Sequence, residues 1–200
     1  MAVALSSSAT MYLRIRQLID REDTAYFTDA EIEEFLESAV DEFIHQYYGV
    51  FEVNQEVRDK LQSLVNKTTA SFPASTLEYN LTDIDAAYMR LLSATLTNDP
   101  KTRVKIIQLS DLSAYLSDPF NKATDDSPVI YIKGSKLHIL GPSKKTDVDV
   151  YWLKYTNTFS DLPDHTYEEL CNITARKILA TLGDPRYEIQ SREITTERRG

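Results

Sequence analysis

The sequence contains few of the residues on which several common kinds of site depend, with 5 Gly, 1 Cys and 1 Trp among 200 residues. A loop that cradles phosphates needs several glycines in one short stretch, and the five scattered glycines supply no such stretch. The lone cysteine, Cys171, excludes a disulfide within the chain, so nothing here requires an oxidising compartment. These shortages exclude a phosphate-binding loop and a disulfide-stapled fold.

Long apolar runs are also missing. None approaches the ~18 consecutive apolar residues of a membrane-spanning helix. The apolar start at residues 1–5 has no basic flank and is too short for the apolar region of a signal peptide. We therefore expect a soluble protein of the cytosolic type, with no membrane partner.

Positive charge is scarce as well. The chain carries 22 Lys and Arg against 31 Asp and Glu, a formal net charge of −9 at pH 7. Nucleic-acid binding depends on Lys and Arg that neutralise phosphates, so this charge opposes it. Such a protein can still surround DNA without binding it.

The hydrophobic content of 42% and the length of the chain suffice for a hydrophobic core that needs no metal or disulfide to stabilise it.

The histidines offer little catalytic chemistry, because His45, His138 and His165 lie far apart in the sequence. Only Glu37, Asp41 and His45 share a spacing of four residues, which places them on one helix face where a divalent metal could bind. A zinc site usually needs more converging nitrogen or thiolate ligands. A solvated polar face opposite an apolar stripe is the favoured interpretation.

Cys171 lies on the apolar stripe of the last predicted helix, where a small buried hydrophobe is expected rather than a nucleophile. Carboxylate pairs fall in turns, in a loop or on the polar face of a strand, where solvated Asp belongs. These pairs are Asp83 with Asp85, Asp125 with Asp126, and Asp147 with Asp149. Because the sequence shows no pair of a nucleophile and a base, we predict a protein that is not an enzyme and has no cofactor and no metal.

The first part of the chain predicts three helices. A flexible arm over residues 1–9 precedes the first of them. The run Thr28-Asp-Ala-Glu31 is a capping box that opens a second helix, which runs to about Tyr48. The apolar stripe of this helix is wide enough for the helix to pack on two sides, and one side could contact a neighbouring subunit. Asn54 can cap a third helix that runs to about Val65.

The middle of the chain reads as loops and strands. Residues 88–96 fit either a strand or a helix, and a strand is favoured because a second strand at 103–109 follows across the turn at 98–100. The other predicted elements are a loop at 68–75, an extended segment at 79–83, and a short helix from Ser110 to Leu116 that Asp118-Pro119 ends.

Residues 129–183 predict a three-stranded meander followed by one long helix. Gly134-Ser135 joins the first two strands in a tight hairpin, and residues 147–155 alternate as the third strand. Asp164 or Thr166 caps the final helix, and Gly183 ends it. The order of elements predicts an α+β fold, a bundle of about four helices with an inserted antiparallel β region, rather than an alternating βαβ plan.

The predicted organisation is one α+β domain over residues 10–183, with the β insertion at about 70–160 and an extended tail at 184–200. Arg186, Arg192, Arg198 and Arg199 make this tail basic relative to the acidic rest of the chain. Such an arm could fold onto an acidic partner surface through Arg–carboxylate pairs, or it could be a frayed terminus. The 12 Tyr favour protein–protein contact, since Tyr is enriched at interfaces.

This succession resembles the head–tail connector proteins of tailed bacteriophages, also called adaptor, head-completion or neck-ring proteins. The resemblance extends from about residue 11 to the tail and is an order of motifs rather than one signature. The motifs are Phe27-Thr-Asp-Ala-Glu31-Ile32, Pro128-Val-Ile-Tyr-Ile-Lys-Gly-Ser-Lys-Leu-His-Ile-Leu-Gly-Pro142, Val148-Asp-Val-Tyr-Trp-Leu-Lys-Tyr155, Leu162-Pro163-Asp164 and Leu182-Gly-Asp-Pro-Arg186. The β insertion is longer than in the smallest members, which leaves open which ring of the neck the chain would form.

The resemblance implies a structural virion protein that assembles in the host cytoplasm. Members form homo-oligomeric rings of twelve subunits below the portal, extend the DNA channel and contact the next tail component. DNA would pass through without specific binding. By this resemblance Glu33, Glu34, Glu37 and Asp41 are candidates for the channel face, and the four tail arginines are candidates for contacts with the portal or a neighbouring subunit. Two alternatives remain open: a metal-dependent enzyme, and a monomeric binding or chaperone-like module.

Overall fold

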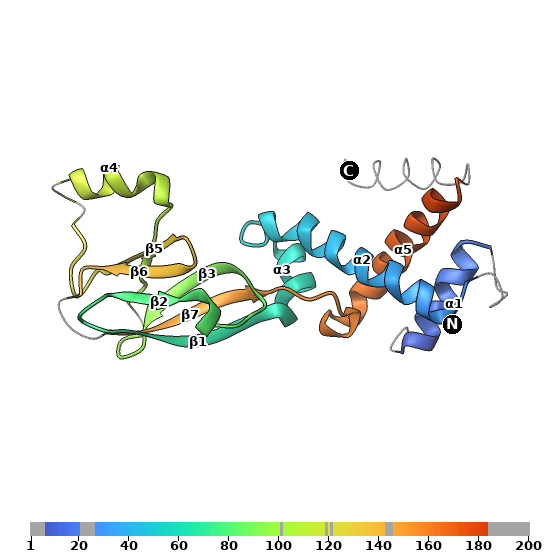
Figure 1. Ribbon diagram of the computed structural model, residues 1–200, viewed down its shortest axis with the longest axis horizontal. Coiled ribbons are helices and arrows are strands. Elements are labelled where there is room, and N and C mark those ends of the chain that lie inside the picture. Colours follow the sequence, from blue (N-terminus) through green and yellow to red (C-terminus); the bar gives the residue numbers. More distant parts are fainter. Residues whose placement is uncertain are drawn as a thin grey trace. The chain divides into compact units, whose positions relative to one another are not determined.

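The computed structural model describes residues 7–20, 27–100, 102–118, 120, 122–142 and 146–183. The chain divides into two compact units. We call the first the helical unit, which comprises Met1–Ser63 and Thr156–Gly200, and the second the strand unit, which comprises Leu64–Tyr155 (Figure 1). In the sequence the strand unit therefore separates the two halves of the helical unit. No helix of the described residues is long and apolar enough to cross a membrane.

The described residues of the helical unit form four α-helices, of which α5 packs against α1 and α2. The helices are α1 (Ser8–Leu18), α2 (Asp29–Tyr47), α3 (Gln55–Leu61) and α5 (Tyr167–Leu182), with 3-10 turns at Tyr48–Val50, Gln62–Leu64, Phe159–Asp161 and Asp164–Thr166. Each of the four contributes buried apolar side chains, as the helical spacing predicts, but Leu13 of α1 and Leu182 of α5 are 49% and 42% exposed.

Local capping residues fix where these helices begin and end. Thr28 and Glu31 form the predicted capping box of α2: each side chain accepts a hydrogen bond from the other's backbone N–H. Gly183 takes the left-handed conformation, φ 66°, at the end of α5, which is also as predicted. The side-chain cap predicted for α5 is wrong: a 3-10 turn at Asp164–Thr166 leads into the helix, and Thr166, its N-cap residue, makes no side-chain cap bond.

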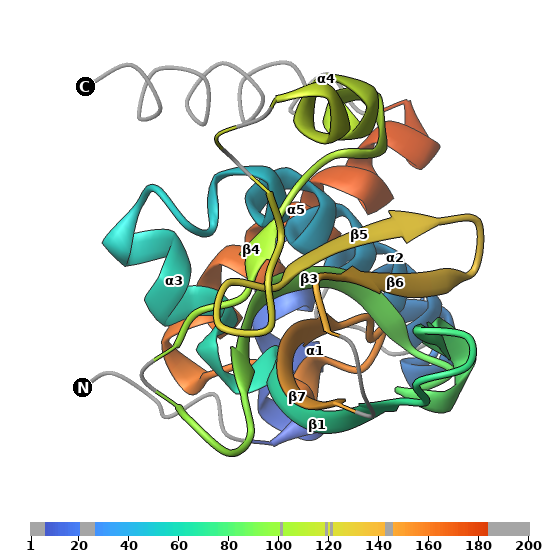
Figure 2. The ribbon, with the colours of Figure 1, turned by 90° about the vertical axis from the view of Figure 1, so that its left-hand side faces the viewer.

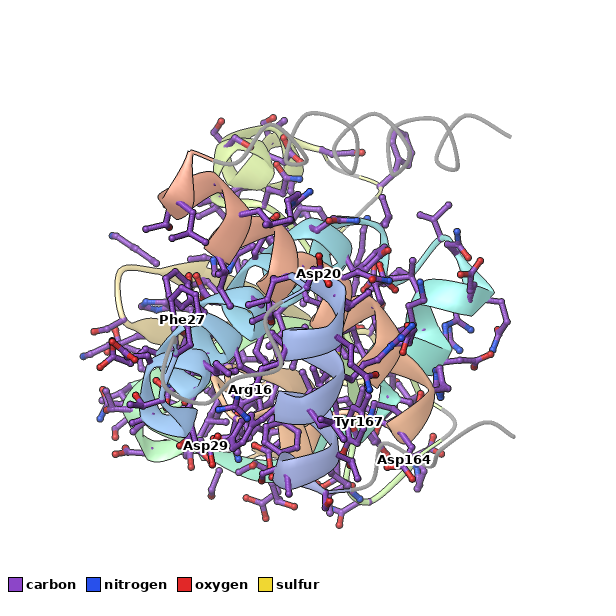
Figure 3. All side chains as sticks on the ribbon, turned by 90° about the vertical axis from the view of Figure 1, so that its right-hand side faces the viewer. Arg16, Asp20, Phe27, Asp29, Asp164 and Tyr167 are labelled. Carbon is purple, nitrogen blue, oxygen red and sulfur yellow. The ribbon has the colours of Figure 1, made fainter. Side chains whose placement is uncertain are left out.

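Helix α1 begins within the segment that the sequence predicts to be a flexible arm. Ser7 caps α1 by accepting a hydrogen bond from the backbone N–H of Thr10, so two residues of the expected arm, Ser8 and Ala9, are helical. Arg16 then ties α1 to the start of α2, since its guanidinium donates to the carbonyl oxygen of Phe27 at 3.1 Å and to Oδ1 of Asp29 at 2.5 Å (Figure 3).

The strand unit, in the residues that the structure describes, forms two sheets and one short helix. The strands are β1 (Val65–Phe72), β2 (Glu78–Asn80), β3 (Tyr88–Leu96), β4 (Lys105–Ile106), β5 (Val129–Lys133), β6 (Lys136–Leu140) and β7 (Thr146–Lys154), and the helix is α4 (Leu112–Ser117), with 3-10 turns at Leu81–Asp83 and Leu109–Asp111. One sheet has the order β1-β7-β3 and the other the order β2-β6-β5-β4 (Figure 2). All neighbours are antiparallel except β4 and β5, which are parallel.

One core joins the two sheets, because buried side chains of both belong to a single cluster. Val148, Val150 and Trp152 alternate along β7 and point into this cluster, as the period of two predicts. The indole Nε1 of Trp152 donates to Oγ1 of Thr68 on β1 at 3.1 Å, which satisfies its one polar group.

Two predictions are wrong, one about which strands pair and one about where a loop lies. The three-stranded meander does not form, because β7 pairs with β1 and β3 and not with β6. The loop predicted at 68–75 lies largely within β1, whose pairing with β7 is continuous from Val65 to Phe72. The run Asn66-Lys-Thr-Thr69 is polar and therefore lacks the apolar pattern that predicts a strand. Its β-branched residues nevertheless pair well in a sheet.

Other strand predictions are confirmed. The segment 88–96 is strand β3, and Gly134, with φ 60°, occupies the turn between β5 and β6. The strand predicted at 103–109 is only β4, two residues long, with Arg103 bridged to Thr95 of β3. The described residues thus form five α-helices and two sheets, which confirms a fold of helices together with mainly antiparallel strands.

Candidate assembly surfaces

The four acidic residues predicted to face a channel lie on α2, opposite its buried stripe. Glu33, Glu34 and Glu37 are exposed and Asp41 is half-buried. The structure therefore places all four on one helix, at the solvent side of the helical unit. What they would face in an assembly is part of the proposal below.

Two of these glutamates already have contacts within the helical unit. Glu33 and Glu37 line a small cavity of about 70 Å³ together with Asn157. Oε2 of Glu37 accepts a hydrogen bond from Nδ2 of Asn157 at 3.3 Å. Glu33 contacts Tyr12 of α1, where burial first and then the charge of Glu33 raise the pKa of the phenol. Glu34 is an exposed member of the set with none of these contacts.

The metal-binding trio considered from the sequence is not brought together. Nδ1 of His45 lies 2.9 Å from the carbonyl oxygen of Asp41 and 3.2 Å from its Oδ1, while Glu37 contacts Asn157. Across the part of the chain that the structure describes, no three His, Cys, Asp or Glu side chains are grouped to hold a metal ion. His45 and Asp41 instead form a pair one helical turn apart.

A larger cavity of about 600 Å³ opens in the helical unit and contains a linked polar cluster. Nζ of Lys60 donates to Oε2 of Glu169 at 2.9 Å and lies 3.2 Å from Oε1 of Glu56. The hydroxyl of Tyr47 donates to Oε1 of Glu169 at 2.5 Å, and Nζ of Lys60 lies 4.6 Å from the centre of the Tyr47 ring. The cluster joins α2, α3 and α5.

Lys60 and Tyr47 of this cluster are both held in the protonated form. Burial alone would lower the pKa of Lys60, but the hydrogen bond and charge of Glu169 outweigh it and hold that pKa above the ordinary value. Burial, followed by the same carboxylate, raises the pKa of Tyr47. Both groups therefore keep their protons at neutral pH, so neither is poised as a general base. These polar contacts link α2, α3 and α5.

Cys171 is fully buried in α5, as the sequence predicts. Burial first, with a smaller contribution from the charge of Glu168, raises the pKa of its thiol to about 12. At neutral pH it is a protonated, fully buried thiol, which is not the state of a nucleophile.

The prediction of a solvated carboxylate is wrong for Asp149. It is 6% exposed, because β7 is the central strand of its sheet and both neighbours cover it. Its Oδ2 pairs with Nζ of Lys67 at 2.8 Å, and its Oδ1 accepts hydrogen bonds from Thr69 at 2.7 Å and Thr97 at 3.1 Å. The hydrogen bond from Lys67 first, and then that from Thr69, hold the pKa of Asp149 below its usual value.

The four arginines proposed for partner contacts, Arg186, Arg192, Arg198 and Arg199, lie outside the described residues, as do residues 1–6 of the predicted arm. Their placement therefore stays a prediction.

The structure also reveals a surface that the sequence reading missed. Four large apolar side chains are exposed along residues 105–120 of the strand unit: Ile106 at 38%, Leu109 at 48%, Leu116 at 62% and Phe120 at 94%. Contiguous exposed apolar side chains mark interaction sites. A signal was present, because Leu109, Leu112 and Leu116 recur at helical spacing in a segment too short to build a core.

No protein-family model and no curated protein sequence matches the chain.

Proposed function

We propose that this protein is a structural subunit of a bacteriophage neck, a head-to-tail connector that forms a ring below the portal and extends the DNA channel. The observation that carries the proposal is the construction of the chain. Helices from both ends form one unit, and a two-sheet unit intervenes in the sequence between α3 and α5. A helical bundle with an inserted β region is the arrangement that the resemblance to connector proteins leads us to expect.

The helical unit has the internal ties that a ring component needs. The guanidinium of Arg14 on α1 pairs with Glu168 on α5, and both Arg176 and Lys177 of α5 pair with Glu42 on α2. Partly exposed ion pairs contribute little one by one, but here they hold three packed helices in a fixed arrangement. In the proposed ring, helices of neighbouring subunits pack side by side.

The acidic face of α2 is assigned to the channel wall. A wall rich in carboxylates repels the phosphates of DNA, so that DNA slides past without binding. Glu34 and Asp41 are the residues to test, since Glu33 and Glu37 contact other segments of the unit, whereas Asp41 pairs with His45 on its own helix. In phage carrying Glu34→Lys with Asp41→Lys, we expect slower DNA ejection with normal particle numbers. Glu34→Gln with Asp41→Asn is the matched control, and ejection at the normal rate in the Lys variant would count against a channel position.

The mass of the assembled protein tests the proposal as a whole. Light scattering of the purified chain, alone and mixed with the portal ring encoded in the same genome, should show a ring, about twelve copies by the resemblance, in one or both samples. Electron microscopy of the mixture should show that ring stacked coaxially on the portal. A chain that stays monomeric with portal present would refute the connector function.

A monomeric binding module is the second candidate, and the exposed apolar segment at residues 105–120 favours it. The two functions separate in the same experiment, because a binding module stays monomeric and passes the portal without forming a ring.

A further inference from the structure

In the residues that the structure describes, the two sheets have four edge strands, and three of these are protected against pairing with another chain. An unpaired edge offers a row of free backbone N–H and C=O groups, and proteins protect such edges by making the strand short, bulged or covered. Strands β2 and β4 are only three and two residues long. Strand β3 has two register shifts against β7, and residues 102–104 cover part of its outer side, where the N–H of Val104 donates to the carbonyl of Ala94 at 2.9 Å.

Strand β1 has none of these protections. Its eight residues, Val65–Phe72, pair with β7 without a register shift. Figures 1 and 2 both show β1 along the lower side of the strand unit, with β7 beside it. Because alternate residues of an antiparallel strand direct their backbone groups away from the neighbour, about four residues of β1 point their N–H and C=O groups outward. Among the described residues, no backbone hydrogen bond of β1 reaches a segment other than β7.

The lysine of β1 does not protect the edge either. A lysine on an edge strand usually opposes pairing, because it keeps a charge beside the free backbone groups. Nζ of Lys67 instead lies 2.8 Å from Oδ2 of Asp149 and 5.8 Å from the centre of the Tyr151 ring, and both of these residues belong to β7. The Lys67 side chain therefore points back over the sheet, where a carboxylate compensates its charge. Strand β1 is a long, regular and open edge of the kind to which an added strand binds.

A second copy of β1 fits this edge when the two strands run antiparallel. Every copy of the chain has the same open edge, so one two-fold contact closes the edges of both copies at once. Residues that lie opposite each other across the contact must belong to the same face of the sheet, and successive residues alternate between the faces. The numbers of two opposite residues therefore add up to an even number.

Two registers pair nearly the whole strand without placing like charges opposite each other. When the numbers of opposite residues add up to 136, residues 65–71 of both copies pair and Lys67 lies opposite Thr69. When they add up to 138, residues 66–72 pair and Lys67 lies opposite Ser71. A sum of 134 would pair only residues 65–69 and place Lys67 opposite itself, which is unfavourable because Lys67 is the one charged residue of β1.

Other classes of partner fit the edge less well. Nucleic acid has no row of amide groups that could continue the ladder, and the net charge of −9 opposes its approach. A strand of an unrelated protein would close the edge of this chain alone, whereas the β1 strand of a second copy closes two.

We propose that the free protein forms a two-fold pair, in which the β1 strands of two copies join antiparallel. The two sheets then become one sheet with the strand order β3-β7-β1-β1-β7-β3. This inference does not rest on the connector function, since it follows from the strand unit alone. A two-fold contact cannot repeat between neighbours around a ring, so the pair is a form of the chain outside the ring.

Crosslinking between introduced cysteines tests the pairing and its register. The native Cys171 is fully buried and gives little background. Full-length protein with Lys67→Cys is mixed with full-length protein that has Thr69→Cys or Ser71→Cys, and a thiol crosslinker of ~5 Å is added, which is the distance between opposite side chains in a sheet. We expect one of the two mixtures to give the mixed dimer rapidly, and Lys67→Cys alone to give little. Lys67→Cys that crosslinks to itself as fast as in the mixtures, or no crosslink between copies in either mixture, would overturn the proposal.

The dissociation constant of the pair, measured by sedimentation equilibrium without portal, is the second test. Thr69→Lys adds a lysine that lies opposite Lys67 of the second copy in one register and opposite the same substitution in the other. We expect the dissociation constant to rise about fivefold or more, and the difference to shrink as salt is added.

Thr95→Lys is the matched control, because Thr69 and Thr95 both lie opposite Asp149 in the sheet, one on β1 and one on β3. This variant should leave the dissociation constant unchanged. Fluorescence of Trp152 during unfolding shows whether both variants are folded. Wild-type protein that is monomeric at every concentration, or an equal effect of the two substitutions, would refute the β1 pair.

These results separate the inference from the connector function. A ring on the portal, formed by protein that gives no crosslink through β1, removes the pair and leaves the connector. A dimer whose crosslinks follow the even sums, in protein that forms no ring with the portal, does the reverse.

Discussion

Replacement of Gly141 by alanine should destabilise the strand unit far more than replacement of any other glycine tested beside it. Gly141 follows β6 with φ 106°, a backbone conformation that residues with a side chain rarely adopt. A Cβ there would lie 2.5 Å from the carbonyl oxygen and 2.8 Å from the backbone nitrogen of Thr124. Thr124 cannot give way cheaply, because it exchanges two backbone hydrogen bonds with Ser127, both 3.2 Å long.

The magnitude follows from two separate costs. A positive φ costs a residue with a Cβ about 1–2 kcal/mol. Pressing an extra carbon into a filled space adds about 1–3 kcal/mol. Gly141→Ala should therefore lose about 2–5 kcal/mol of unfolding free energy. With a urea slope of ~2 kcal/mol per M, the unfolding midpoint falls by about 1–2.5 M.

Substitutions at two other glycines distinguish the cost of the positive φ from the cost of the close contact. Gly134 also has a positive φ, 60°, but nothing lies within 4 Å of its Cβ position, so Gly134→Ala should lose only about 1–2 kcal/mol. Gly49 has neither a positive φ nor a close neighbour, so Gly49→Ala should be neutral or stabilise its own unit by up to ~1 kcal/mol.

Urea unfolding followed by tryptophan fluorescence measures the effect in the correct unit. Trp152 is the only tryptophan and is buried in the core of the strand unit. If Gly141→Ala and Gly134→Ala shift the midpoint equally, the close approach of Thr124 to Gly141 is refuted. A shift of the same size in Gly49→Ala would show that the fluorescence does not report on the strand unit alone.

Three further predictions concern buried polar groups and the thiol. Arg16→Met keeps the packing of the side-chain stem but removes the hydrogen bonds to Asp29 and to the Phe27 carbonyl. Unfolding followed by helical circular dichroism should therefore show that the helical unit loses about 1.5–3 kcal/mol of unfolding free energy. An unchanged unfolding free energy would refute the link between α1 and α2. Because folding lowers the pKa of Asp149, its ionised carboxylate stabilises the folded protein. This stabilisation is complete above about pH 4 and disappears as the pH falls through the pKa that Asp149 has in the folded protein. Fluorescence unfolding of Asp149→Asn should accordingly give lower stability at pH 7 and a smaller loss on acidification, and a parallel pH profile would contradict this. Cys171, buried and with its pKa raised to about 12, should react with a thiol reagent at neutral pH only as fast as the helical unit opens, whereas immediate reaction would place it at the surface.

Predictions from the sequence were most accurate where the signal is local. The Thr28–Glu31 box and Gly183 define helix ends through atoms a few residues apart, so the sequence contains the whole cause. The turn at Gly134 and the burial of Cys171 on an apolar stripe are of the same kind.

Pairing between distant segments could not be obtained in this way. The alternation of β7 shows which face is buried, but not which strands lie beside it. Its neighbours are β1 and β3, about 80 and 60 residues earlier in the chain. The burial of Asp149 follows from these neighbours, because Lys67, Thr69 and Thr97 reach it only once the sheet has formed.

By itself, therefore, the sequence determined the helices, the N-caps Thr28 and Asn54, the helix end at Gly183, the β5–β6 turn, the acidic charge and the helical spacing of Leu109, Leu112 and Leu116. The tertiary structure decided that β7 is a central strand, that Asp149 is buried, and that Leu109 and Leu116 are exposed. The reason is physical. Spacing fixes which side chains share a face, but contacts between distant parts of the chain decide whether that face meets the core or the solvent.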